Sequence, residues 1–172
     1  MRRSFLIACL LFLLPAAVEA QPRLMVGGGF TAPQGDLGDV ADPGWHLGVG
    51  LNLGIPTLPV GLRADGRLHK MGAGDTALRD TEYLTGAISL VFRLPGVGLE
   101  PYVLGGMGTY RYSGGANSDP DVTRFSDTGY HAGFGIATGQ LGLGLFAEIR
   151  YVYIDTEAGS NAMIPLTLGF RL

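Results

Sequence analysis

Five charged residues recur at intervals of two in segments that otherwise carry little charge. Arg63, Asp65 and Arg67 form one set, and Glu148 and Arg150 form a second. Residues two apart in an extended chain share one face, so each set presents its charges to the same side. Such groups line a polar pathway, bind an anionic group, or pair into a structural ion network. Because buried charges are tolerated only when paired, the network is the favoured interpretation.

Three histidines, His46, His69 and His131, are the residues that a catalytic or metal site would use. A serine hydrolase needs a Ser, a His and an acid within mutual reach, and the sequence contains no His-x-Ser pair. Metal-ligand spacing is absent around all three. The sequence therefore predicts no catalytic residue, no metal site and no cofactor, although separate strands can still bring such residues together in space.

Six aspartates gather in two segments that are rich in turn-forming residues. Their carboxylates would suit Ca²⁺ or Mg²⁺, including ions that bridge lipopolysaccharide, but the EF-hand pattern is absent. Aspartate is also a favoured turn residue, so solvated loops are the simpler interpretation. The six residues are Asp36, Asp39, Asp42, Asp119, Asp121 and Asp127.

The segments that carry these residues alternate apolar and polar side chains with a period of two. Every second residue from Trp45 to Leu53 is apolar, with His, Gly and Asn between them. A helix would scatter this set around its circumference, whereas a strand places it on one face. The pattern predicts eight strands, at 23–31, 44–54, 60–69, 81–94, 100–112, 128–138, 142–153 and 163–172.

The connections between these strands alternate in length. Three are short and have tight-turn composition: 55–59, 95–99 and 139–141. Four are long: 32–43, 70–80, 113–127 and 154–162. This rhythm is typical of an up-and-down barrel with short turns at one end, here called the turn rim, and long loops at the other, the loop rim. An even number of strands leaves both chain ends at the turn rim.

The composition narrows the class of protein. The chain has 172 residues, of which 47% are hydrophobic and 16% charged, and it contains 29 glycines. A chain this apolar can bury a core, which excludes disorder, and the glycines lack the period of three that collagen requires. The formal net charge of −3 provides no basic footprint for nucleic acid.

The first 20 residues resemble a secretory signal peptide. Arg2 and Arg3 precede an apolar run over 5–14, and Val18-Glu19-Ala20 is a small-residue cleavage site. Leu6-Ile7-Ala8-Cys9 resembles a bacterial lipobox, but the apolar run continues past Cys9, which favours cleavage after Ala20. The predicted domains are a signal peptide at 1–20 and one barrel domain at 21–172. No later segment has the eighteen apolar residues that a transmembrane helix needs.

The polar faces of the strands decide whether the apolar faces meet lipid or a soluble core. A lipocalin-like barrel would line its cavity with the apolar face, and a membrane barrel would turn that face outward. Here the polar faces carry small residues such as Gly48 and Gly133, which suit a narrow lumen, and charges that can pair across it. Aromatic residues near strand ends suit interfacial girdles, although Tyr83 is expected to point inward. These features favour the membrane barrel.

Four segments in order resemble the small outer-membrane β-barrel domain family, with its OmpX-, OmpW- and OmpA-type barrels. They are Pro101-Tyr102-Val103-Leu104-Gly105-Gly106-Met107-Gly108, Gly129-Tyr130-His131-Ala132-Gly133-Phe134-Gly135, Phe146-Ala147-Glu148-Ile149-Arg150-Tyr151 and Ile164-Pro165-Leu166-Thr167-Leu168-Gly169-Phe170-Arg171-Leu172. The resemblance implies a C-terminal strand that the barrel-assembly machinery reads through alternating apolar residues and a terminal aromatic. Leu166, Leu168, Phe170 and Leu172 alternate in this way, but the last residue is Leu.

These observations predict an all-β protein: a monomeric, eight-stranded, antiparallel up-and-down transmembrane β-barrel of the bacterial outer membrane. Short turns would face the periplasm and long loops the exterior. The predicted role is structural or surface-interactive, with a lumen plugged by Arg63, Asp65, Arg67, Glu148 and Arg150. Its partners would be outer-membrane lipid, lipopolysaccharide and the barrel-assembly machinery, with no nucleic acid. An OmpW-like channel for small apolar solutes and a lipid A-modifying enzyme are the alternatives.

Overall fold

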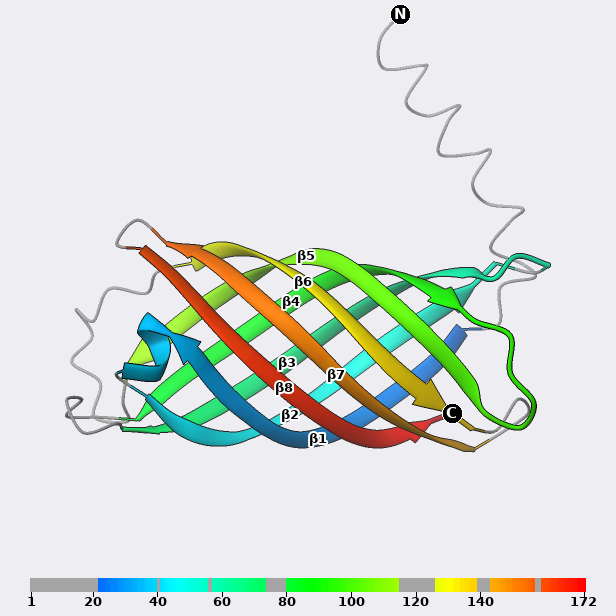
Figure 1. Ribbon diagram of the computed structural model, residues 1–172, viewed down its shortest axis with the longest axis horizontal. Coiled ribbons are helices and arrows are strands. Elements are labelled where there is room, and N and C mark those ends of the chain that lie inside the picture. Colours follow the sequence, from blue (N-terminus) through cyan, green and yellow to red (C-terminus); the bar gives the residue numbers. More distant parts are fainter. Residues whose placement is uncertain are drawn as a thin grey trace, which may run out of the picture.

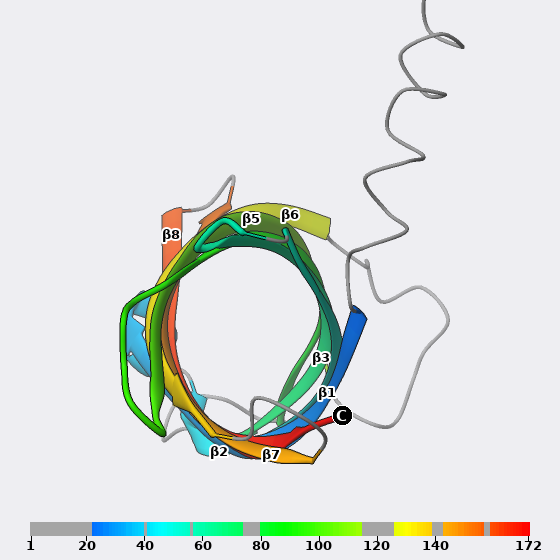
Figure 2. The same ribbon diagram turned by 90° about the vertical axis from the view of Figure 1, so that its right-hand side faces the viewer.

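The computed structural model describes residues 22–39, 41–55, 57–73, 80–114, 126–138, 143–156 and 159–172. Eight antiparallel strands pair in chain order, and β8 closes the barrel against β1 (Figures 1 and 2). The strands are β1 (Pro22–Gly35), β2 (Ala41–Gly54), β3 (Val60–Ala73), β4 (Thr81–Arg93), β5 (Glu100–Gly114), β6 (Ser126–Ala137), β7 (Gly144–Thr156) and β8 (Gly159–Arg171). The predicted fold class is confirmed. The signal peptide predicted at 1–20, with Cys9, lies outside the described residues.

A short 3-10 helix, η2 (Asp36–Asp39), follows β1 at the loop rim. In Figure 1 it lies at the left end of the barrel, and the C-terminal residue lies toward the right end, at the turn rim. No helix within the described ranges combines the length and the apolar character needed to cross a membrane.

Each strand turns its apolar face outward. Leu47 is 58% exposed, whereas the neighbouring His46 is 1% exposed, and the same contrast separates Leu90 at 62% from Ser89 at 1%. A soluble barrel would show the opposite arrangement, because water would meet the polar face. The outward apolar band is the surface that lipid covers in a membrane barrel.

The strands extend further toward the loop rim than the sequence predicts. The ladder between β1 and β8 continues to the pair Gly35 and Asn161, and Thr156 pairs with Gly159. The predicted loop at 154–162 is therefore mostly strand, and the predicted alternation of long and short connections does not hold there. Pairing with the neighbouring strand provides hydrogen-bond partners for the backbone at these strand ends. This gain outweighs the preference of their residues for turns. The interval 115–125 between β5 and β6 stays long.

The six aspartates are divided by these boundaries. Asp36 and Asp39 lie in η2, as part of the first connection. Asp42 and Asp127, which were expected in loops, lie in β2 and β6. Asp119 and Asp121 lie outside the described residues.

The aromatic residues divide between the two faces of the wall. Trp45, Tyr130, Tyr151 and Tyr153 are exposed on the outside. Tyr83 is buried inside, as predicted, and the same is true of two further tyrosines that strand position alone did not assign, Tyr102 and Tyr110.

The lumen is layered along the barrel axis. The inward residues of β7 illustrate the order: Phe146, then Glu148 and Arg150, then Val152 and Ile154. Phe146 belongs to an apolar cluster toward the turn rim, with Met25, Val91, Tyr102, Leu104 and Ala137. Val152 and Ile154 belong to a second cluster toward the loop rim, with Leu37, Ala41, Met71, Tyr83, Tyr110 and Met163. A charged layer therefore lies between two apolar layers.

Glycines provide the space for this charged layer. A Cβ atom added at Gly48 would lie 2.8 Å from Cγ of Arg67, and one added at Gly133 would lie 2.9 Å from Cγ of Arg150. Both distances are shorter than real contacts of this kind. The absence of a side chain at these two positions therefore lets the long arginine side chains cross the narrow lumen.

Candidate functional site

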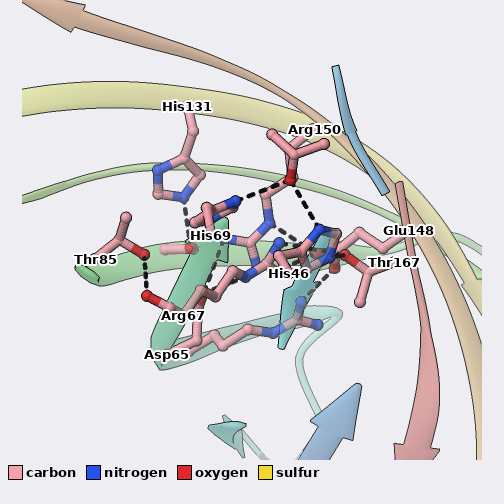
Figure 3. A network of polar contacts seen from close by, with 12 residues as sticks. His46, Asp65, Arg67, His69, Thr85, His131, Glu148, Arg150 and Thr167 are labelled. Atoms are coloured by element: carbon pink, nitrogen blue, oxygen red, sulfur yellow. Dashed lines mark hydrogen bonds and ion pairs between the residues drawn. The ribbon is translucent and has the colours of Figure 1, made fainter. Parts of the chain in front are cut away.

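The charged layer is built from two strands on opposite walls. β3 supplies Arg63, Asp65 and Arg67, and β7 supplies Glu148 and Arg150. Three strands separate β3 from β7 in either direction around the barrel. The alternation of each strand directs its set inward, so the two sets meet across the lumen (Figure 3). All five residues that the sequence singled out therefore lie together.

Glu148 lies at the centre and accepts four hydrogen bonds. Its Oε2 atom accepts from Nη1 of Arg63 at 2.5 Å and from the hydroxyl of Tyr102 at 2.8 Å. Its Oε1 atom accepts from Nη2 of Arg67 at 2.9 Å and from Nε of Arg150 at 2.6 Å. Both carboxylate oxygens are thus saturated, and bonds of this charge-assisted kind are stronger than neutral ones.

Asp65 joins the two walls a second time. Its Oδ1 atom accepts from Nε of Arg67 at 3.0 Å and from Nη1 of Arg150 at 3.1 Å, and its Oδ2 atom accepts from Nη2 of Arg150 at 3.2 Å. Arg150 therefore forms a bidentate ion pair with Asp65 through both terminal nitrogens. Three guanidinium groups face two carboxylates in this layer, so it holds one excess positive charge.

The aromatic ring of Tyr102 stabilises part of this positive charge. The guanidinium carbon of Arg63 lies 5.1 Å from the centre of the Tyr102 ring, within the range of a cation–π interaction. Sequence reasoning placed Tyr102 in a family motif and did not assign it to the network. Its inward position on β5, in register with Glu148 through Gly135 of β6, is the signal that would have found it.

The layer is buried and leaves little space. The exposed fractions are 1% for Glu148, 2% for Arg63 and 4% for Arg150. The cavity that remains beside it, lined in part by Gly48, Asp65 and Arg67, has a volume of about 20 Å³. This volume accommodates about one water molecule.

His46 and His69 adjoin the charged layer on its loop-rim side. The Thr31 hydroxyl lies 2.9 Å from Nδ1 of both imidazoles, whose ring centres are 5.2 Å apart. The single hydroxyl hydrogen is donated to one Nδ1, so the other Nδ1 must carry its own hydrogen and donate to the oxygen. The hydroxyl of Thr167 lies 2.9 Å from Nε2 of His46 and accepts from Nη1 of Arg67 at 3.3 Å. The histidines therefore extend the same network.

His131 contacts a serine instead. Its Nε2 atom lies 2.8 Å from Oγ of Ser89, which joins β4 to β6. Sequence reasoning missed this pair because no short motif links the two residues, although both occupy inward positions. Among the described residues, Nδ1 of His131 has no hydrogen-bond partner, so the acid that orients the imidazole of a serine hydrolase is missing. Both residues are buried, at 1% and 5% exposure.

The remaining predicted residues lie on the outer surface of β8 and directly after its end. Leu166, Leu168, Phe170 and Leu172 are each more than half exposed, and Leu172 is bound to the backbone of Leu24 at the turn rim. Within the described ranges, no group of three or more His, Cys, Asp or Glu side chains is placed to hold a metal ion.

Solved structures with the same architecture are known. The structure is similar to that of Neisserial surface protein A, NspA, with a TM-score of 0.72, 14% identity, and coverage of 88% of this chain and 96% of that one. It is also similar to Ail, the attachment invasion locus protein of Yersinia pestis, in complex with the heparin analogue sucrose octasulfate (TM-score 0.55, 15% identity, coverage 88% and 99%). A third similar structure is that of the outer membrane enzyme PagL (TM-score 0.50, 12% identity, coverage 88% and 99%).

At these identities the similarity establishes the fold. Among curated proteins, none matches the chain significantly. The model of the outer membrane protein β-barrel domain matches residues 4–171, which is nearly the whole chain. The closed eight-stranded barrel, its outward apolar band and this match agree: the chain belongs to the outer membrane protein β-barrel domain family.

Proposed function

We propose that this protein is a structural and surface-interaction barrel of the outer membrane whose lumen is closed by its own charged side chains. The observation that carries the proposal is the layer around Glu148, where buried ion pairs from opposite walls leave a cavity of about 20 Å³. Apolar clusters lie on both sides of this layer. Transport through the lumen would require breaking these pairs, and breaking a buried pair is costly.

Solute efflux from proteoliposomes tests the closed lumen. Purified barrel is reconstituted into vesicles loaded with a pentose, and release is compared with that from vesicles without protein. Efflux at the background rate is expected. Saturable efflux of the pentose, with the ion pairs intact, would favour a channel role instead.

The surface role places the loop rim outside the cell and the turn rim in the periplasm. Two named structural relatives are consistent with it: one is a surface protein and the other an attachment protein bound to a heparin analogue. We propose that residues 1–20 direct export, that outer-membrane lipid and lipopolysaccharide surround the apolar band, and that the barrel is monomeric. Envelope fractionation tests this placement: the protein should sediment with the outer membrane and migrate differently in gels when boiled and unboiled.

An enzymatic role has one structural observation in its favour, the contact between Ser89 and His131. PagL shows that an enzyme occurs on a similar fold. The pair is buried, and the imidazole has no acid partner among the described residues. These two features favour a structural role for the contact between Ser89 and His131 over a catalytic one. Lipid profiles of cells that overexpress the protein and its Ser89→Ala variant discriminate the two roles, because an enzyme would alter the profile and the variant would not.

A further inference from the structure

A second cavity lies at the turn-rim end of the lumen and has a volume of about 370 Å³. This volume lies within the range of small-molecule sites, roughly 300–1,000 Å³. Arg23 of β1, Arg93 of β4, Glu100 of β5 and Arg171 of β8 line it, and Arg63 from the charged layer lines it as well. The cavity therefore extends from the rim to the layer that closes the lumen.

Positive charge dominates this cavity. Arg63 pairs with Glu148, and the other guanidinium groups of the lining belong to Arg23, Arg93 and Arg171. Among the described residues that line the cavity, Glu100 is the one carboxylate, and it pairs with Nη2 of Arg171 at 2.7 Å. Three guanidinium groups therefore line the rim beside one carboxylate. Arg171 and Arg93 repel the Arg23 guanidinium and Glu100 attracts it, so an anion bound among the three arginines would reduce their mutual repulsion.

Two of the rim guanidinium groups also donate to neutral acceptors. Nη2 of Arg93 donates to the carbonyl oxygen of Leu58 at 3.0 Å, and Nε of Arg171 donates to the carbonyl oxygen of Thr138 at 2.9 Å. These bonds fix orientation and leave the charge in place. β4 lies across the lumen from the adjacent pair β8 and β1, so a ligand would be held from both sides. Such preorganisation lowers the entropic cost of binding.

We infer that this turn-rim cavity binds a phosphate-bearing anion from the periplasmic side. Arginine forks match phosphate oxygens with two parallel hydrogen bonds, and the guanidinium groups of the rim attract the negative charge that phosphate esters carry. The direction of access rests on the proposed orientation of the barrel. The phosphate belongs either to a soluble organic phosphate or to the headgroup of an inner-leaflet lipid, which share this chemistry.

Isothermal titration of glycerol 3-phosphate into the purified, folded barrel in a zwitterionic detergent tests the site. Saturable binding is expected. Arg93→Gln should weaken it by about tenfold, because one charge-assisted contact is lost. Glu100→Gln should tighten binding, since it removes the competing carboxylate. Lys70→Gln is the matched control: Lys70 is partly exposed, pairs with Glu82 at 3.8 Å and does not line the cavity. It should leave the affinity unchanged.

The same titration in nanodiscs distinguishes the two sources of phosphate. If phosphatidylglycerol discs abolish binding that phosphatidylcholine discs preserve, the lipid headgroup occupies the cavity. Equal binding in both assigns the site to a soluble phosphate. Absence of saturable binding in every medium, or equal weakening by Arg93→Gln and Lys70→Gln, would overturn the inference. Solute efflux reports on the closed layer independently, so a leaky barrel that still binds phosphate would refute the proposed function alone.

Discussion

Arg63 and Glu148 meet across the lumen from opposite walls, with Nη1 of the arginine 2.5 Å from Oε2 of the glutamate. Three strands separate β3 from β7 in each direction around the barrel, so this contact joins two walls that share no strand ladder. Both side chains are almost completely buried. This ion pair therefore connects β3 and β7 directly, in addition to the backbone hydrogen bonds between neighbouring strands.

Glu148→Gln should lower the free energy of unfolding strongly. The substitution leaves Arg63, Arg67 and Arg150 buried with Asp65 as the remaining acid of the layer. Removing one partner from a buried pair typically costs about 3–5 kcal/mol. Urea unfolding in lipid vesicles, followed by the gel shift on boiling, measures the change. Glu82→Gln is the control: its pair with Lys70 is exposed and is worth at most about 1 kcal/mol.

A double-mutant cycle should show that Arg63 and Glu148 act as a unit. Arg63→Met removes a charge from a layer that already has an excess of positive charge, and Glu148→Leu removes its partner. The double variant should be less destabilised than the sum of the two single variants, because neither charge is left buried alone. Unfolding free energies that simply add would show that the contact contributes no coupling.

Gly133→Ala should destabilise the barrel more than a glycine substitution on the outer face. The added methyl group would lie 2.6 Å from the carbonyl oxygen of Ile149 and 2.9 Å from Cγ of Arg150. Overpacking of this kind costs typically about 1–3 kcal/mol. Gly86→Ala is the control, because its nearest neighbour, Oγ1 of Thr109, lies 3.9 Å away. Equal unfolding free energies for the two variants would contradict the tight fit of Arg150.

Phe170→Ala should reduce assembly in cells more than refolding in vitro. Phe170 is 53% exposed on β8, so its removal leaves the lumen unchanged. If the assembly machinery reads this strand, the variant is recognised less well. The amount of heat-modifiable protein in outer membranes is compared with the yield of refolding in detergent. Phe92→Ala, an outward aromatic on β4 at 44% exposure, should affect the two measurements equally. The same loss for both variants in cells would remove the assembly role of Phe170.

The period of two was sufficient to predict the barrel and the facing of its charges. Side chains alternate between the two faces of a strand. Residues 63, 65 and 67 therefore share one face of their strand, and residues 148 and 150 share one face of theirs. In a membrane barrel the apolar residues of each strand, such as Leu47 and Leu90, face the lipid. The charged residues on the other face of their strands must then point into the lumen.

Contacts between strands were beyond the reach of this pattern. The alternation of side chains places Ser89 and His131 inside the barrel. The hydrogen bond between them depends on strand order, tilt and register together. The shared hydroxyl of Thr31 between His46 and His69 depends on the same three quantities. The loop-rim strand ends were also missed, because turn-forming residues such as Asp42 can extend a strand wherever a neighbour offers backbone partners.

Conductance in planar bilayers tests the closed lumen most directly. The unmodified barrel should show no stable conductance, and Glu148→Gln should open a small pathway that favours anions, because three guanidinium groups then face one carboxylate. Glu82→Gln should remain as closed as the unmodified barrel. A stable conductance in the unmodified protein that Glu148→Gln leaves unchanged would contradict a lumen closed by these ion pairs.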